Sequence, residues 1–147
     1  MRGRLAAALL AGALLLGGCR ASVKTGYFAV QTSPEANDRS PVPVAVVVVY
    51  DAALLKTVAA LTAHDWFARR AQLTRDHPTG FQAVSWEFVP GQTVPLQPLR
   101  LRRKKARGAF VFADYAAPGD HRVRVDPYRR VVIRLLDADV AVEPLRR

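Results

Sequence analysis

The chain has 147 residues, half of them hydrophobic, which fits one compact domain and excludes a large multidomain protein. Its formal net charge is +10 and its only cysteine is Cys19, which excludes a fold held together by intrachain disulfides. A basic excess of this size is typical of proteins that bind nucleic acid, anionic lipid or acidic protein surfaces, and the N-terminus helps to decide among them.

The N-terminal stretch has the pattern of a bacterial export signal. Arg2 and Arg4 precede a run of Leu, Ala and Gly over residues 5–16, which is too short to cross about 30 Å of hydrocarbon as a permanent helix. Residues 16–19 read Leu-Gly-Gly-Cys and resemble the bacterial lipobox, whose cysteine receives a diacylglycerol and becomes the new N-terminus. The sequence therefore predicts a signal peptide over residues 1–18.

Cys19 is the residue that we expect to carry the lipid. The alternative, an ordinary secretory peptide, would leave one unpaired thiol in an oxidising compartment. Two or more acyl chains hold a protein stably on a membrane without a transmembrane helix. Arg20, rather than Asp, follows the cysteine, and by resemblance to lipoprotein sorting this favours the periplasmic side of the outer membrane. We expect residues 19–26 to form a short tether.

The first half of the mature chain predicts two strands and a loop. Residues 27–31 form a first strand candidate, and residues 32–41 are dense in turn formers and read as a surface loop. Residues 42–50 are rich in β-branched residues and do not alternate, which predicts a strand buried on both faces. Another layer must then cover the outer side of its sheet.

Two helices are predicted to supply that layer. Asp51 is a plausible N-cap, and apolar residues recur at helical spacing from Leu54 to Leu61. Thr62 begins a capping box with Asp65, and this second helix is expected to run to about Arg75. His-Pro-Thr-Gly at residues 77–80 then ends the helical pattern.

The remaining chain reads as short strands joined by turns. Apolar and polar residues alternate over residues 84–88, and two prolines place residues 94–101 at a sheet edge. Further strand candidates are residues 109–115, 122–125, 131–136 and 140–142, with a hairpin turn at residues 137–139. The number of strands indicates a mainly β protein, with one β-sandwich domain over residues 27–143 and a helical insertion after the second strand.

The order of these pieces resembles the TssJ family of type VI secretion lipoproteins. The similarity rests on the lipobox, Ser-Pro-Val-Pro-Val at residues 40–44, Trp-Phe at 66–67, Trp-Glu-Phe-Val-Pro-Gly-Gln at 86–92 and Gly-Ala-Phe-Val-Phe-Ala-Asp-Tyr at 108–115. The resemblance implies a transthyretin-like antiparallel β-sandwich. It also implies a structural role: holding the periplasmic domain of a large inner-membrane partner.

In this family the loop between the first two strands contacts the partner. The resemblance therefore implies partner-binding residues at Thr32, Ser33, Glu35, Asn37, Asp38 and Arg39. A different class of function, a lipid-anchored protein that binds a small ligand or another envelope protein, remains the alternative. A pocket between helix and sheet would favour the ligand-binding form of that alternative.

Catalytic and metal-binding patterns are not found in the sequence. His64, His77 and His121 each adjoin an aspartate, but neighbours in sequence do not make a site. We see no nucleophile elbow, P-loop or dinucleotide turn, so we predict no enzyme, no cofactor and no metal. The aromatic residues are interpreted as core and comprise Trp66, Phe67, Trp86, Phe110 and Phe112.

A cluster of positive charge lies between residues 100 and 107. We interpret it as a basic hairpin formed by Arg100, Arg102, Arg103, Lys104, Lys105 and Arg107. Three roles stay open: a solvated hairpin that discourages edge pairing of the sheet, a contact with anionic lipid headgroups, or docking on an acidic protein patch. Nucleic acid is excluded, because the cluster lacks interleaved aromatic residues and an exported protein does not meet it.

Overall fold

The computed structural model describes residues 23–146. The predicted signal peptide at residues 1–18 and the predicted lipid site at Cys19 lie outside the described residues. Within residues 23–146, no helix has the length and apolar character needed to cross a membrane.

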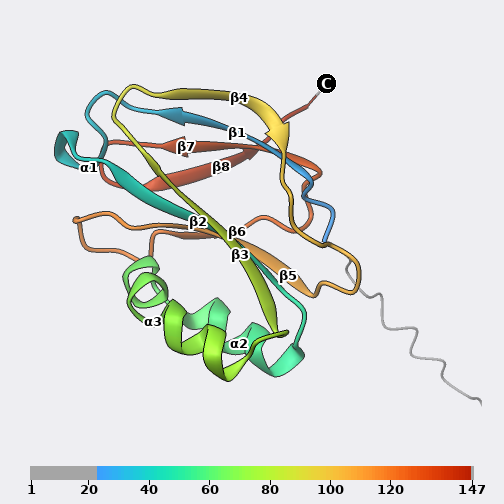
Figure 1. Cartoon of the computed structure of the whole chain (residues 1–147). Coiled ribbons are helices and arrows are strands. Elements are labelled where there is room, and N and C mark those ends of the chain that lie inside the picture. The colour runs from blue at the N-terminus through green and yellow to red at the C-terminus, as the bar shows by residue number, and fades with distance from the viewer. Residues whose placement is uncertain (1–22, 147) are drawn as a thin grey trace, which may run out of the picture.

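In residues 23–146, eight strands form two four-stranded sheets that pack face to face, with two helices on the outside of one sheet (Figure 1). The first sheet has the strand order β4 (Thr93–Pro98), β1 (Tyr27–Thr32), β7 (Arg130–Leu135), β8 (Val140–Pro144). The second sheet has the order β3 (Phe81–Phe88), β2 (Val42–Val49), β5 (Gly108–Ala113), β6 (Arg122–Arg124). The helical elements are α1 (Ala36–Arg39), α2 (Ala52–Ala60) and α3 (Ala63–Asp76).

The predicted mainly β sandwich with a helical insertion after the second strand is confirmed. All strand pairs but one are antiparallel. The exception is β1 with β7, which run parallel from Tyr27 opposite Arg130 to Thr32 opposite Leu135. A parallel pair needs a long crossover connection, and here the chain supplies it by building the whole second sheet between β1 and β7.

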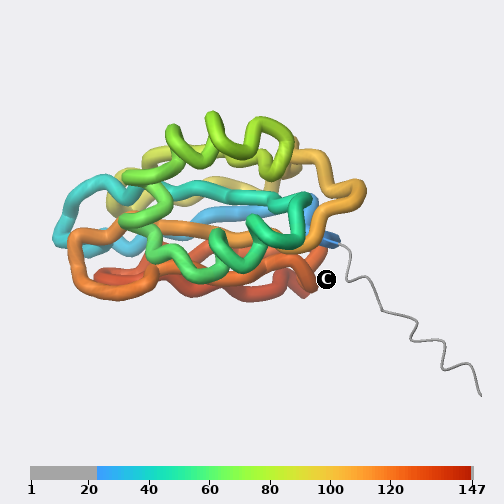
Figure 2. The backbone as a smooth tube through the Cα atoms, turned by 90° about the horizontal axis from the view of Figure 1, so that it is seen from below, coloured from blue at the N-terminus to red at the C-terminus, as the bar shows by residue number. Residues whose placement is uncertain are grey.

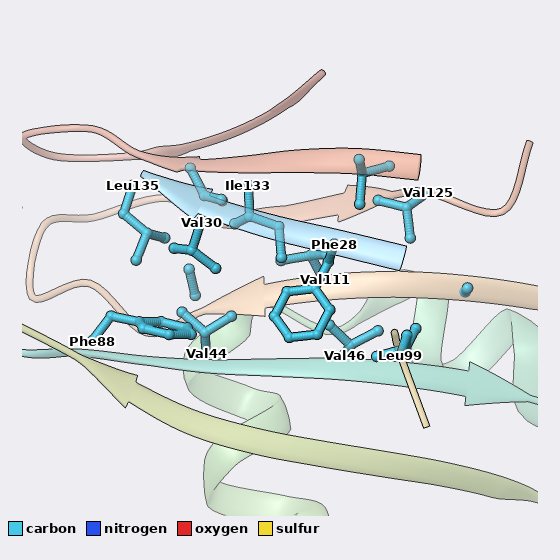
Figure 3. Close-up of a cluster of buried hydrophobic side chains, with 14 of the residues drawn as sticks. Phe28, Val30, Val44, Val46, Phe88, Leu99, Val111, Val125, Ile133 and Leu135 are labelled. Atoms are coloured by element: carbon cyan, nitrogen blue, oxygen red, sulfur yellow. The ribbon is translucent and has the colours of Figure 1, made fainter. Parts of the chain in front are cut away.

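The main core fills the space between the two sheets (Figure 3). Phe28 and Ile133 project from the first sheet towards Val44 and Val111 of the second, and all four side chains are buried. Alternate residues of β3 also point inward, as the period of two predicted, since Val84, Trp86 and Phe88 pack in or against this cluster.

A second core lies between the second sheet and the helices, which lie across its outer face in both views (Figures 1 and 2). Val47 of β2 and Phe112 of β5 face α2 and α3, while their sequence neighbours face the main core. Trp66 of α3 stacks on Phe112 with ring centroids 5.3 Å apart. The prediction that β2 is buried on both faces is therefore confirmed, and the helices are the covering layer.

Local signals placed the helix starts correctly. The Asp51 carboxylate accepts a hydrogen bond from the Leu54 amide at 2.7 Å, and the Thr62 hydroxyl accepts one from the Asp65 amide at 3.1 Å. The start of β3 was predicted three residues too late. Residues 81–83 pair with β2, and Phe81 turns its ring against Trp66, so packing extends the strand beyond the alternating segment.

The order of the strands separates the connecting segments into two groups at opposite ends of the sandwich (Figures 1 and 2). We call one group the loop end, formed by residues 33–41, 89–92, 114–121 and 136–139. We call the other the basic end, formed by residues 23–26, 99–107, 125–129 and 145–146. Because β1 runs from one end to the other, the start of the described chain and the β1–β2 loop are a full strand apart.

The folded part of the chain begins earlier than residue 27. Val23 is buried, the Lys24 amide donates to the Asp126 carbonyl at 3.0 Å, and the Thr25 hydroxyl donates to the Val125 carbonyl at 2.6 Å. Residues 23–26, predicted as part of a tether, are thus bound to the sandwich.

Candidate interaction surfaces

The β1–β2 loop contains a left-handed turn. Asn37, Asp38 and Arg39 in α1 have φ values of 50°, 53° and 61°. For residues other than glycine this conformation costs roughly 1–2 kcal/mol each, and Asn and Asp tolerate it best. Three such residues in succession persist only where surrounding contacts hold them.

Two side chains of the loop supply those contacts. The Asn37 side-chain oxygen accepts from the Ala116 amide at 2.8 Å, and its NH₂ group donates to the Pro41 carbonyl at 3.0 Å. The Asn37 backbone amide donates to the Asp137 carbonyl at 2.8 Å, and the Ser33 hydroxyl donates to the Asp137 carboxylate at 2.5 Å. The loop is therefore tied to the loops at residues 114–121 and 136–139.

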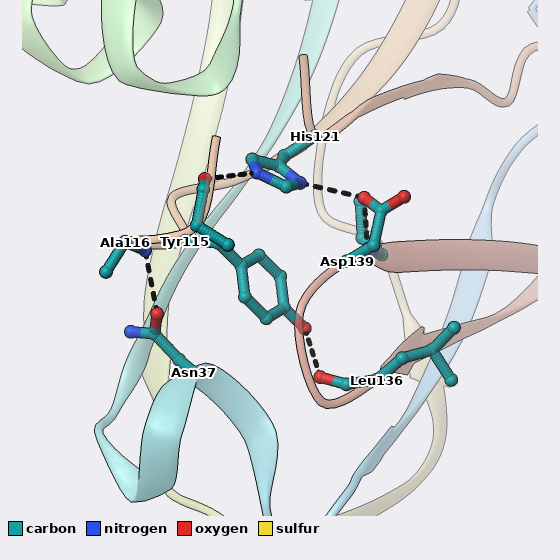
Figure 4. A network of polar contacts seen from close by, with 8 residues as sticks. Asn37, Tyr115, Ala116, His121, Leu136 and Asp139 are labelled. Carbon is teal, nitrogen blue, oxygen red and sulfur yellow. Dashed lines mark hydrogen bonds and ion pairs between the residues drawn. The ribbon is translucent and has the colours of Figure 1, made fainter. Parts of the chain in front are cut away.

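Those neighbouring loops are joined to each other by His121 (Figure 4). Its Nδ1 lies 2.8 Å from a carboxylate oxygen of Asp139, and its Nε2 lies 2.7 Å from the Ala117 carbonyl oxygen. The Tyr115 hydroxyl donates to the Leu136 carbonyl at 2.9 Å. Both partners of the imidazole are acceptors, so both ring nitrogens are satisfied only when the ring carries two protons.

The electrostatics of this network favour the charged pair. Burial alone would lower the pKa of His121, but its hydrogen bonds to Asp139 and to the Ala117 carbonyl raise the pKa above its ordinary value. Burial would raise the pKa of Asp139, yet the hydrogen bond with His121 and the Val140 amide lowers it. Burial also raises the pKa of Tyr115, which keeps its hydroxyl a donor.

Gly119 makes room for the imidazole. Its φ is 154°, and a Cβ at this position would lie 2.8 Å from the His121 ring. Any larger residue would displace the ring from between its two acceptors. Sequence reasoning missed this network, because Asp139 is 18 positions from His121 and no local pattern links them.

The structure divides the six residues predicted to bind a partner. Glu35, Asp38 and Arg39 are exposed, with Glu35 and Arg39 paired at 2.7 Å. Ser33 and Asn37 are half-buried and hold the loop in place. The prediction for Thr32 is wrong as to exposure: it ends β1 with its side chain buried, because alternation along the strand turns it inward.

The interpretation of residues 100–107 as a hairpin is wrong. The strand before them, β4, belongs to the first sheet and the strand after them, β5, to the second, so the segment crosses between sheets. A tight hairpin joins neighbouring strands of one sheet, which these are not. We call residues 100–107 the basic segment from here on.

The basic segment is held by backbone and aromatic contacts rather than by carboxylates. The guanidinium of Arg102 lies 4.4 Å from the centre of the Tyr50 ring, and Arg107 donates to the Tyr50 carbonyl at 2.9 Å. Arg103 lies against Gly26 and donates to the Lys24 carbonyl at 3.2 Å. Between residues 23 and 146, no carboxylate lies within ion-pair distance of any cation in this segment.

The other predicted features fall into the interior or on the surface. Trp66, Phe110 and Phe112 are buried, and Phe67 and Trp86 pack against the two cores, which confirms their interpretation as core residues. His64 is exposed and lies 3.7 Å from Asp114. In the described part of the chain, no three His, Cys, Asp or Glu side chains gather as metal ligands would.

The space between helix and sheet bears on the ligand-binding alternative. It is occupied by buried apolar side chains, among them Val47, Trp66 and Phe112. A ligand pocket between helix and sheet, as the alternative requires, would have to occupy the space that these apolar side chains fill.

No protein-family model matches this chain, and no curated protein matches it in sequence. Solved structures similar to it include three described as type VI secretion proteins. The T6SS lipoprotein TssJ1 from Pseudomonas aeruginosa matches at 14% identity with a TM-score of 0.62, over 84% of this chain and 98% of that one. Serratia marcescens Lip, a membrane bound component of the Type VI Secretion System, matches at 13% identity with a TM-score of 0.57, over 83% and 99%.

The third structure is described as the T6SS protein TssM C-terminal domain from EAEC. It matches at 14% identity with a TM-score of 0.58, over 81% of this chain and 97% of the matched chain. At identities this low the likeness shows the fold alone, and the coverage shows that it extends over most of this chain. The chain therefore has the fold of the TssJ family.

Proposed function

We propose that this chain is a lipid-anchored lipoprotein of the outer membrane, facing the periplasm, and a non-enzymatic structural component of a type VI secretion membrane complex. The observation that carries the proposal is the likeness of the whole sandwich to two lipoproteins of such systems, combined with the lipobox that ends at Cys19. The fold and the export signal are independent, and they support the same kind of protein.

In this proposal the loop end binds the periplasmic domain of a large inner-membrane partner. The β1–β2 loop offers three exposed charged side chains on a backbone that its neighbours hold rigid. A preorganised loop loses little conformational entropy on binding, which favours a stable contact. Glu35, Asp38 and Arg39 would make the contact, while Ser33 and Asn37 keep the loop in shape.

A pull-down with a periplasmic fragment of the partner tests the loop assignment. Replacing Glu35, Asp38 and Arg39 together by alanine should weaken binding at least tenfold, since no backbone contact of the loop is removed. The matched control also removes two carboxylates and one cation, at the exposed α3 positions Asp65, Asp76 and Arg69, and should bind as the unmodified chain does. Equal binding by both variants would contradict the assignment.

Membrane attachment is tested separately. Cells grown with labelled palmitate should yield labelled protein, and the Cys19→Ser form should lose both the label and its sedimentation with outer membranes. An unlabelled protein, or a Cys19→Ser form that still sediments with outer membranes, would remove the lipoprotein part of the proposal.

A further inference from the structure

The basic end collects positive charge from segments far apart in the sequence. The Gly26 amide donates to the Arg129 carbonyl and the Leu99 amide donates to the Gly26 carbonyl, so residues 23–26 lie between the other two segments. The cations of this end are Lys24, Arg100, Arg102, Arg103, Lys104, Lys105, Arg107, Arg129 and Arg146, and Arg130 adjoins them at the start of β7. Figure 1 shows the start of the described chain and residues 99–107 on the same side of the molecule, away from α1.

Few acidic groups balance this charge. Asp126 is buried and pairs with Arg124 at 2.6 Å, and the carboxylate of Asp51 caps α2. Glu143, close to this end of β8, pairs with Arg134 at 2.9 Å. The loop end, by contrast, carries Arg39 against six acidic residues: Glu35, Asp38, Asp114, Asp120, Asp137 and Asp139. The molecule is therefore polarised along its strands, basic at one end and acidic at the other.

The basic end also has the apolar groups found at membrane interfaces. Tyr128 and Leu145 are 37% and 39% exposed, and they line a shallow depression together with Arg129 and Arg130. Aromatic rings beside cations are favoured at the headgroup level, where one side of the ring is apolar and the other is wet.

The chain itself limits how far this end can be from a lipid on Cys19. Val23 is buried in the fold, and four residues of extended chain span at most about 14 Å. The β1–β2 loop lies farther away by the length of β1, roughly 20 Å for six residues. With a lipid on Cys19, the cations of the basic end would thus lie nearer to the anchor than the β1–β2 loop does.

We propose that the basic end is a second membrane contact, which docks on anionic phospholipid headgroups and turns the loop end away from the bilayer. The proposal rests on the lipid-anchor part of the proposed function. Three roles were left open for the basic segment, and this proposal favours contact with lipid headgroups. The reason is that the tether brings this surface to the membrane whether or not a protein partner is bound.

The test uses the full lipidated protein in vesicles of phosphatidylcholine alone or mixed with phosphatidylglycerol. Lipidation consumes Cys19, so a cysteine introduced as Tyr128→Cys or Asp38→Cys is the single free thiol for a fluorophore. A nitroxide on the lipid headgroups should quench the label at position 128 several-fold more than the label at position 38. The difference should shrink in phosphatidylcholine alone and at high salt.

A matched pair of variants assigns the effect to the basic segment. Lys104→Gln with Lys105→Gln removes two exposed cations of the basic end, and Lys56→Gln with Arg69→Gln removes two from the helices. Each cation near an anionic leaflet favours docking about fivefold, so the first pair should lower the ratio of docked to undocked protein roughly 25-fold at low salt. The second pair should leave that ratio unchanged.

Equal quenching at both labels would overturn the inference. So would quenching at position 128 that is the same with and without phosphatidylglycerol and is unchanged in the Lys104→Gln, Lys105→Gln variant. So would a Lys104/Lys105 variant that docks normally but loses the partner fragment, since the segment would then be a protein contact. An unlabelled protein in the palmitate experiment, by contrast, would contradict the lipid-anchor part of the proposed function.

Discussion

The loop end and the basic end are built alike, from segments that join successive strands, but they are stabilised differently. At the loop end, side chains bond across loops: Asn37 to Ala116, Ser33 to Asp137 and His121 to Asp139. At the basic end, backbone hydrogen bonds from residues 23–26 and bonds from Arg103 and Arg107 to backbone carbonyls hold the segments together, while Lys104 and Lys105 are exposed.

This difference helps to distinguish side chains that stabilise the fold from side chains that are available to bind a partner. A side chain whose polar atoms are all used inside the protein has little left for a partner, whereas an unpaired exposed cation costs the fold little and is free to bind. Substitutions of the bonded loop-end side chains Ser33, Asn37 and His121 should therefore change stability. Substitutions of exposed charges, at either end, should change binding with little effect on stability.

The largest effect is expected at His121. His121→Ala should lower the free energy of unfolding by about 3 kcal/mol, because it removes a charge-assisted hydrogen bond and leaves a cavity beneath Tyr115. His77→Ala, at an exposed position after α3, should change it by less than about 0.5 kcal/mol. Urea denaturation measures the free energy of unfolding of both variants. Equal losses would contradict the stabilising role assigned to the His121 network.

A smaller effect should appear as a dependence on pH. Because the pKa of His121 is raised in the folded state, its contribution is fully present below the ordinary value of 6.5 and is lost as pH rises through the raised value. The lowered pKa of Asp139 makes its contribution present above 3.8 and lost as pH falls through the lowered value.

The unmodified chain should therefore exceed His121→Gln in stability most clearly between about pH 4 and 6.5, with the gap narrowing towards pH 9. Urea midpoints of both proteins across this range measure the gap. A gap that widens with pH would show that the imidazole is neutral in the folded protein.

Next in size is the loop itself. Asn37→Ala should cost about 1–2 kcal/mol more than Asp38→Ala, since both residues have a positive φ but only Asn37 bonds to Ala116 and Pro41. Hydrogen exchange at the Ala116 amide should accelerate in the first variant and not in the second. Equal rates would mean that the backbone alone holds the turn.

The smallest effect on stability belongs to the basic end. The Lys104→Gln, Lys105→Gln variant should unfold within about 0.5 kcal/mol of the unmodified chain, because neither side chain has a carboxylate partner in residues 23–146. Thermal and urea unfolding check this. A large loss of unfolding free energy would show that the basic segment stabilises the fold. The contrast between a stabilising loop end and a binding basic end would then be wrong for this segment.

Predictions from sequence succeeded where the signal was local. The cap at Asp51, the capping box at Thr62 and the unbroken apolar run of β2 each reflect contacts within a few residues or burial on both faces, and all three are found in the fold. The start of β3 at Phe81 was missed because a contact with Trp66, from another element, extends the strand.

The candidate surfaces were predicted only in part. The β1–β2 loop was placed correctly, yet the inward side chain of Thr32 and the left-handed turn depend on how neighbouring loops meet it. The basic segment was recognised by composition. Its path between two sheets was not, since a run of charges contains no information about which strands it joins.

The sequence by itself predicted an exported lipoprotein, and it determined a β-sandwich with a helical layer, because helix caps and hydrophobic periodicity act over short distances. Only the tertiary structure decided what lies together at each end. Thr25 meets Val125 across 100 positions and His121 meets Asp139 across 18, through strand direction and sheet pairing that no local pattern specifies.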